Sequence, residues 1–144
     1  MKIVIDANVI LSALFSQNGA SNRLLIWLFS QKKNYNVISN TLVTEFEDIL
    51  TRDKNMKKFA NLSREDIESF IDDICLISFY QKINFLWRPF LKDQKDDMVL
   101  EVAFNAGADV IVTGNIKDFK NVTKHFGIKI LTPQEFLKQL GELS

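Results

Sequence analysis

Residues 2–10 read "KIVIDANVI", and this stretch indicates both the fold class and the first candidate site residue. The short Ile and Val run over residues 3–5 is typical of a buried strand in a parallel sheet. The run leads directly into Asp6, whose side chain prefers water, and an apolar helical pattern follows over residues 9–15. Position alone leaves two interpretations open. Asp6 caps that helix, a task that Asn8 can also perform, or Asp6 belongs to a functional site.

Short apolar runs alternate with helical patterns along the rest of the chain. Alternation of this kind predicts an α/β domain with a mostly parallel central sheet between two layers of helices. The length of 144 residues suits one such domain over residues 1–144. Further strands are expected at 36–39, 76–79, 109–113 and 128–131, and helices at 21–31, 41–52, 62–75, 96–107 and after 132.

Several of these boundaries carry their own signals. Ser63 and Thr132 each stand three residues before an acid, as in a capping box, and Ser21 is a candidate cap for the helix over 21–31. Gly107 is expected to end the helix before it. Residues 80–93 follow neither period, so no regular structure is predicted there.

Composition narrows the chemistry that the chain can perform. The chain has one cysteine, Cys75, and one histidine, His125, so a zinc site of Cys and His ligands lacks the ligands it needs. A single cysteine, no leader-like N-terminus and no apolar run of about 18 residues are expected of a cytoplasmic protein. Neither a glycine-rich phosphate loop nor a G-x-G-x-x-G motif occurs.

Oxygen-bearing side chains instead follow two of the predicted strands, at the edge where parallel α/β sheets bind ligands. Asp6 follows the first strand, and Asn115 and Asp118 lie in the loop after residues 109–113. The alternative for this loop is a plain turn, because Gly-Asn is a common turn pair.

The helix over 41–52 carries an acid at each edge of its apolar stripe. Leu42, Phe46 and Ile49 lie on that stripe, and Glu45 and Glu47 flank it equally far out. Periodicity therefore does not choose between the two glutamates, and a solvated flank is the alternative for both.

The helix over 96–107 begins with two aspartates on different faces. Asp96 is expected on the buried face with Leu100, whereas Asp97 is expected on the polar face with Glu101 and Asn105. A carboxylate on a buried face is costly unless it is paired or bound to a metal. Asp96 is therefore the candidate site residue, and Asp97 is expected to be a first-turn acid that the helix dipole favours.

The candidates together form a site of oxygen ligands only. Several carboxylates that converge without cations repel one another and are partly neutralised by protonation. A hard divalent cation such as Mg²⁺ or Mn²⁺ relieves that repulsion, and phosphoryl transfer is the usual chemistry of such a site. The candidate ligands are Asp6, Glu45, Asp96 and an oxygen from Asn115 or Asp118.

The motifs, in this order, resemble the PIN domain family. "DANVI" after a strand, "EFEDIL" at 45–50 preceded by "VIS", and above all "DQKDDMVLEVAFNAGADVIVTGN" at 93–115 are similar to PIN domains of the VapC-like toxins of toxin–antitoxin systems. The likeness is collinear from residue 1 to about residue 136. It implies a single PIN-like domain and a Mg²⁺- or Mn²⁺-dependent endoribonuclease. Such an enzyme hydrolyses RNA phosphodiesters with a metal-activated water.

The resemblance also assigns residues. Asp6, Glu45 and Asp96 match the acidic metal-binding residues of the family, which are its catalytic acids. The aspartate that the family carries after "VTG" is Asn115 here, which offers a carbonyl oxygen without a charge. Asp118 matches a further acid of this loop and is expected to compensate as a metal ligand.

Supporting roles follow from the same likeness. Thr113 matches the small hydroxyl residue of the motif and is expected to orient a carboxylate or a phosphate. Asn8 and Asp97 are expected to support the site.

The charge balance fits an RNA substrate once the acids are treated as bound to metal. The chain has 18 basic and 18 acidic side chains, and setting aside Asp6, Glu45, Asp96 and Asp118 leaves 18 against 14. Two clusters are expected to bind the RNA backbone, and a solvated charge run is the alternative for each. Their candidate residues are Arg52 and Lys54 in one cluster and Lys117 and Lys120 in the other.

Two other functions stay open beside the ribonuclease. One is a catalytically impaired PIN-like domain that binds RNA, with Asn115 as the damaging change. The other is a phosphohydrolase of small phosphate esters, which the Asn at position 8 disfavours because an aspartyl-phosphate mechanism usually needs an acid there. A homodimer and an antitoxin partner are also expected, because the helix over 21–31 is more apolar than one core stripe requires. The residues concerned are Leu24, Leu25, Trp27, Leu28 and Phe29.

Overall fold

The computed structural model describes residues 1–59, 61–86 and 88–141. In this part of the chain, five parallel strands form one sheet in the order β3-β2-β1-β4-β5. The parallel sheet predicted from the sequence is confirmed, and its carboxyl ends all meet at one edge. The strands are β1 (Ile3–Ile5), β2 (Asn36–Ile38), β3 (Ser78–Tyr80), β4 (Val110–Val112) and β5 (Lys129–Leu131).

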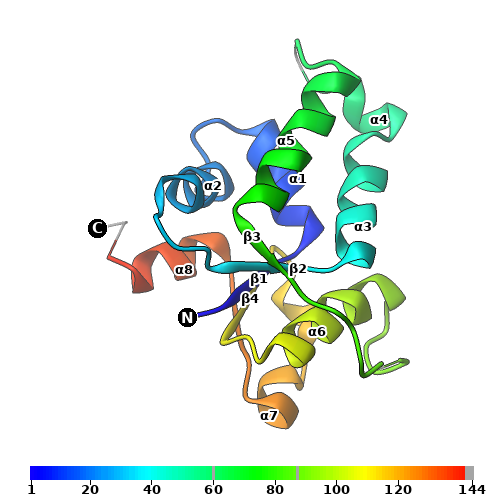
Figure 1. The fold of residues 1–144 in the computed structure, drawn as a ribbon, viewed down its shortest axis with the longest axis vertical. Helices are drawn as coiled ribbons and strands as arrows, with labels where there is room; N and C mark the ends of the chain where they lie inside the picture. Colours follow the sequence, from blue (N-terminus) through cyan, green and yellow to red (C-terminus); the bar gives the residue numbers. More distant parts are fainter. Residues whose placement is uncertain (60, 87, 142–144) are drawn as a thin grey trace.

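Helices cover both faces of this sheet, which confirms the three-layer α/β/α architecture (Figure 1). Figure 1 shows α1, α2, α3 and α5 on one side of the sheet and α6 and α7 on the other. None of the helices in the described part of the chain is long and apolar enough to cross a membrane. The helices are α1 (Ala7–Phe15), α2 (Ala20–Ser30), α3 (Asn40–Leu50), α4 (Asp53–Met56), α5 (Arg64–Leu76), α6 (Gln94–Ala106), α7 (Val122–Phe126) and α8 (Pro133–Gln139), with a 3₁₀ turn η1 (Ile116–Phe119).

Most of the predicted element boundaries are confirmed by their caps. Ser63 and Thr132 both close capping boxes, at the start of α5 and of α8. Gly107, with φ of 64°, ends α6 in the left-handed conformation that glycine adopts at little cost. The expected cap at Ser21 is wrong, because α2 begins one residue earlier and Gly19 occupies the cap position.

The third strand begins later than predicted. Helix α5 continues through Leu76, so β3 starts at Ser78 rather than at residue 76. Residues 81–93 contain no helix or strand where the structure describes them, as predicted, and residue 87 of this segment lies outside the described residues.

The apolar surface of α2 is used within the fold more than the sequence suggested. Leu24, Leu25 and Leu28 are buried. Trp27 stacks on Tyr35 with ring centroids 5.3 Å apart and meets Phe136 of α8 edge-on. Most of the apolar face of α2 therefore packs within the fold, in part against α8, whereas Phe29 stays 39% exposed.

Helix α6 departs most from its predicted faces. Asp97 and Glu101 were expected on a solvated face, yet they are 0% and 1% exposed. The reason is that both sides of α6 are covered. The sheet lies on one side, and the described residues of the irregular segment, 84–86 and 88–91, lie on the other. We call these residues the strap.

Three polar side chains spaced by four residues hold the strap to α6. Asp97 Oδ1 accepts hydrogen bonds from the peptide N–H groups of Phe90, at 3.3 Å, and Leu91, at 2.8 Å. Glu101 accepts from Nε and Nη2 of Arg88 at 2.9 and 2.8 Å. The last of the three side chains is Asn105, which bonds the peptide groups of residues 84 and 85. We call Asp97, Glu101 and Asn105 the polar ladder.

We expect Asp97→Ala to lower the free energy of unfolding by about 1–3 kcal/mol, because two peptide N–H groups lose their acceptor. Urea denaturation measures this loss. Asp73→Ala, which removes an exposed acid from α5, is the matched control and is expected to change stability by at most about 0.5 kcal/mol. Equal stability of the two variants would mean that Asp97 does not hold the strap.

Candidate active site

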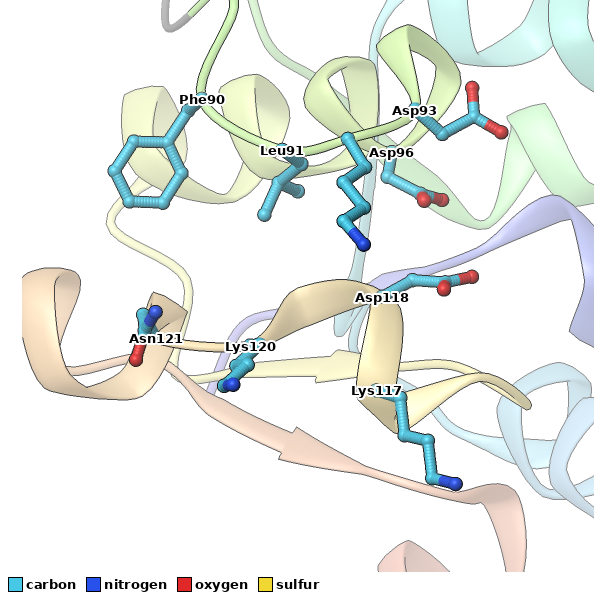
Figure 2. Close-up of a pocket in the computed structure, with 9 residues that line it drawn as sticks. Phe90, Leu91, Asp93, Asp96, Lys117, Asp118, Lys120 and Asn121 are labelled. Atoms are coloured by element: carbon cyan, nitrogen blue, oxygen red, sulfur yellow. The ribbon is translucent and has the colours of Figure 1, made fainter.

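Three carboxylates from distant parts of the sequence meet at the carboxyl edge of the sheet. Asp6 stands between β1 and α1, Asp96 lies in the first turn of α6, and Asp118 lies in η1, shortly after β4. Burial raises the pKa of Asp6 and of Asp96, the charge of Asp118 raises both further, and the charge of Asp6 also raises that of Asp96. Figure 2 shows the side chains of Asp96 and Asp118 directed to the same side of the cleft from facing elements.

Asp6 is held by side chains rather than used as a cap. It occupies the cap position of α1, but its side chain makes no capping hydrogen bond within the described structure. Its Oδ2 accepts hydrogen bonds from Thr113 Oγ1 at 2.8 Å and from Asn8 Nδ2 at 3.2 Å. Burial raises the pKa of this 8% exposed carboxyl, and the hydrogen bond from Thr113 opposes that rise.

Asn8 and Thr113 also fix the loop after β4. Asn8 Oδ1 accepts a hydrogen bond from the N–H of Gly114 at 3.0 Å, and Thr113 Oγ1 accepts one from the N–H of Asn115 at 3.1 Å. The start of α1 and the end of β4 are therefore joined through Asp6 and its two partners. Asn115 itself is exposed.

Asp96 is the carboxyl most affected by its surroundings. Burial raises its pKa most, and the charges of Asp6, Asp118, Asp93 and Asp97 raise it further, to about 7. A half-buried acid in this state exchanges its proton near neutral pH. Such acids are found at functional sites more often than elsewhere.

Glu45 lies nearby and has a cationic neighbour. Its Oε1 is buried and accepts no hydrogen bond from any described residue, and Lys95 Nζ lies 3.5 Å away. Because Lys95 precedes Asp96, this ion pair brings Glu45 to the start of α6. Glu47, the other glutamate that periodicity allowed, is exposed and lines a separate hollow with Arg64.

A cleft of about 460 Å³ opens beside the acids. Figure 2 shows Asp93, Asp96 and Asp118 at one end of it and Phe90 and Asn121 at the other. Basic and apolar side chains complete its walls. The lining residues are Phe90, Leu91, Lys92, Asp93, Asp96, Lys117, Asp118, Lys120 and Asn121.

The two basic clusters noted in the sequence lie in different parts of the fold. Lys117 and Lys120 line the cleft. Arg52 follows the end of α3, where it forms an ion pair with Asp48 at 2.6 Å, and Lys54 lies in α4. Helix α3 starts at the carboxyl edge of β2 and leads away from it, so this second cluster lies at the far end of that helix (Figure 1).

The donor chemistry of the site suits a hard divalent cation. Its side chains offer oxygen ligands, burial and neighbouring acids raise the pKa of Asp96, and the buried Glu45 Oε1 has no hydrogen-bond donor among the described residues. In the described ranges, no three His, Cys, Asp or Glu side chains are close enough to hold one ion as they stand.

Sequence reasoning missed several residues around the acids. Phe90, Lys92 and Asp93 enter the cleft because the strap leads directly into α6, and Asn121 enters from the turn before α7. No periodic pattern covers these segments. Lys95, which pairs with Glu45, was also missed, although its position next to Asp96 in the sequence could have indicated it.

The comparisons with known proteins agree with this fold. A family model described as PIN domain matches residues 2–117. The chain therefore belongs to the PIN domain family, whose members are generally nucleases. It is also 24% identical to uncharacterized protein MJ1680 of Methanocaldococcus jannaschii, over 96% of this chain and 91% of that protein.

Solved structures support the same fold. VapBC-1 from nontypeable Haemophilus influenzae matches with a TM-score of 0.60 and 17% identity, over 93% of this chain and 99% of that one. VapBC2 from Rickettsia felis, bound to a DNA fragment from its promoter, matches with a TM-score of 0.61 and 12% identity, over 92% and 98% of the two chains. At these identities the likeness concerns the fold.

The raised pKa of Asp96 gives the metal-free protein a defined pH dependence. The folded state keeps a proton up to about pH 7 that the unfolded state, with a pKa near 3.8, has already released. The free energy of unfolding is therefore expected to fall as the pH rises between these two values.

We expect the free energy of unfolding of Asp96→Asn to fall less with rising pH than that of the wild type. The variant should therefore melt at a higher temperature than the wild type at about pH 8 in EDTA. Thermal unfolding at about pH 5 and about pH 8 measures the effect. Asp73→Asn removes one exposed charge elsewhere and serves as the control. If Asp96→Asn and the wild type lost the same stability between about pH 5 and about pH 8, the raised pKa of Asp96 would be contradicted.

Proposed function

We propose that this protein is a metal-dependent endoribonuclease, the toxin component of a toxin–antitoxin pair. The observation that carries the proposal is the convergence of Asp6, Asp96 and Asp118 at the carboxyl edge of the sheet, where burial and mutual repulsion raise the pKa of Asp96 to about 7. Membership of a family of nucleases supports phosphodiester hydrolysis as the reaction class.

In this proposal Asp6, Glu45, Asp96 and Asp118 hold Mg²⁺ or Mn²⁺, with Asn115 as a neutral oxygen ligand. When bound, such an ion activates a water for attack on phosphorus and stabilises negative charge on the phosphate. For Asp96 to act as a ligand it must lose its proton, so metal binding strengthens as the pH rises through about 7.

The neighbouring side chains prepare the acids for this task. Thr113 and Asn8 donate to the same oxygen of Asp6, Oδ2, which fixes the orientation of the carboxylate. Lys95 forms an ion pair with Glu45, and a divalent cation at the site would compete with Lys95 for this carboxylate. Asp97 supports the site by holding the strap that forms one wall of the cleft.

The lysines of the cleft complete the proposal. Lys117 and Lys120 stand on the η1 side of the cleft, within the region that an RNA phosphate backbone would cross to reach the acids. Arg52 and Lys54 lie beyond the end of α3, away from the cleft, so they would contact only an RNA strand long enough to extend from the acids to that end of the helix.

The direct test is cleavage of a single-stranded RNA by the purified protein in Mn²⁺. We expect Asp6→Asn and Asp96→Asn each to lower the rate about 100-fold or more, because the ion supplies several kcal/mol of transition-state stabilisation. Asp73→Asn is the matched control and should cleave like the wild type. Cleavage that survives both site substitutions would show that the metal assignment is wrong.

A second candidate function is favoured by one observation, the exposed Asn115 in place of a carboxylate. In that case the protein binds RNA with little or no cleavage. Asn115→Asp is expected to tighten Mn²⁺ binding about tenfold or more, as an added charged ligand would, and to raise the rate of cleavage. Titration calorimetry and the RNA digest measure the two effects. Unchanged binding would remove Asn115 from the ligand set.

We also propose an antitoxin protein as partner and a homodimer as the functional unit. Exposed apolar side chains on α2, Ile26 and Phe29, support a protein contact there. Mass measurement by light scattering after size exclusion tests the dimer, and a strict monomer at about 100 μM would remove it.

A further inference from the structure

The cleft continues beyond the acids, and its far end has a different chemistry. Three carboxyl side chains lie at one end, and Phe90 and Asn121 lie at the other (Figure 2). Its volume of about 460 Å³ is in the range of small-ligand pockets. An RNA strand that brings a phosphate to the acids would lay an adjoining nucleotide along this cleft.

Phe90 is exposed yet held in place. It is 36% exposed, whereas the next residue, Leu91, is 8% exposed and packs into the core. The ring of Phe90 meets those of Phe126 and His125 edge-on, at centroid distances of 5.2 and 5.7 Å. Its peptide N–H donates to the buried Asp97. An aromatic ring fixed in this way loses little conformational entropy when a ligand stacks on it.

The rest of the cleft provides the partners that a nucleotide needs. Lys92 lines the cleft together with Phe90. Lys120 lies on the wall opposite Phe90 (Figure 2). Cations that follow a phosphate backbone, together with an aromatic ring for the base, are the usual elements of single-strand binding sites. Among the described residues, Phe90 is the aromatic side chain that lines this cleft.

We propose that Phe90 is a base-stacking residue that selects unpaired RNA, with Lys92 and Lys120 binding the backbone beside it. The inference rests on the proposed ribonuclease function and adds to it a binding residue and a substrate class. Stacking tolerates every base, so Phe90 favours an unstacked nucleotide over a paired one without reading its sequence. The polar ladder contributes by holding the strap, and Phe90 with it, against α6.

The test begins with binding of a labelled single-stranded RNA, measured by fluorescence anisotropy in EDTA so that the RNA stays intact. We expect Phe90→Ala to weaken binding about tenfold and Phe90→Trp to restore it. Phe90→Leu keeps the apolar volume without the ring and should bind like Phe90→Ala. Phe79→Ala is the matched control, because Phe79 is an exposed phenylalanine on β3 that lines a different hollow.

A set of RNAs, each with one abasic position, then locates the contact. For the wild type, the abasic site that removes the stacked base should weaken binding about tenfold, and Phe90→Ala should lose little more with that RNA. Binding by Phe90→Ala within about twofold of the wild type, or a loss that is equal for every abasic RNA, would overturn the stacking role.

Cleavage of the same RNA in Mn²⁺ separates this inference from the function on which it rests. Wild-type cleavage with unchanged binding by Phe90→Ala overturns the stacking role and keeps the ribonuclease. Binding that depends on Phe90 without any cleavage by the wild type overturns the ribonuclease and supports the stacking role in a domain that only binds RNA.

Discussion

The burial of carboxylates close to one another is the constraint on which the site depends. Asp6 is 8% exposed and shares its surroundings with Asp96 and Asp118, so each charge makes the next one more costly. The protein meets part of that cost with hydrogen bonds from Thr113 and Asn8. The uncompensated part of that cost raises the pKa of Asp96 to about 7, so this side chain keeps a proton near neutral pH. In the proposed function, a bound divalent cation would take the place of this proton.

The second constraint is that α6 is covered on two sides, by the sheet and by the strap. The helix begins at the acids and runs back along the sheet, so one of its faces packs on β1 and β4. Its other face would be solvated without the strap. The polar ladder turns that face into a set of hydrogen-bond acceptors and donors for a segment without secondary structure of its own. The same contacts bring Phe90 and Lys92 to the cleft, so the packing of α6 also shapes the surface beside the acids.

The fold was largely predictable because its signals are local. Alternating strand and helix patterns, two capping boxes and Gly107 defined the elements, and parallel strands placed Asp6 and the loop after β4 at one edge. The faces of α6 were not predictable, since Asp97 and Glu101 are buried by the strap, whose path has no periodicity. Periodicity likewise did not separate Glu45 from Glu47, because the ion pair that places Glu45 at the start of α6 is formed with Lys95 of another helix.

The hydrogen bond from Thr113 to Asp6 joins residues 107 positions apart in the chain. In the sheet, β4 pairs directly with β1, the first strand to be synthesised. A chain emerging from the ribosome therefore carries Asp6 long before the strand that completes its surroundings. Any activity that depends on these acids therefore begins only after residues 1–118 have been translated and folded.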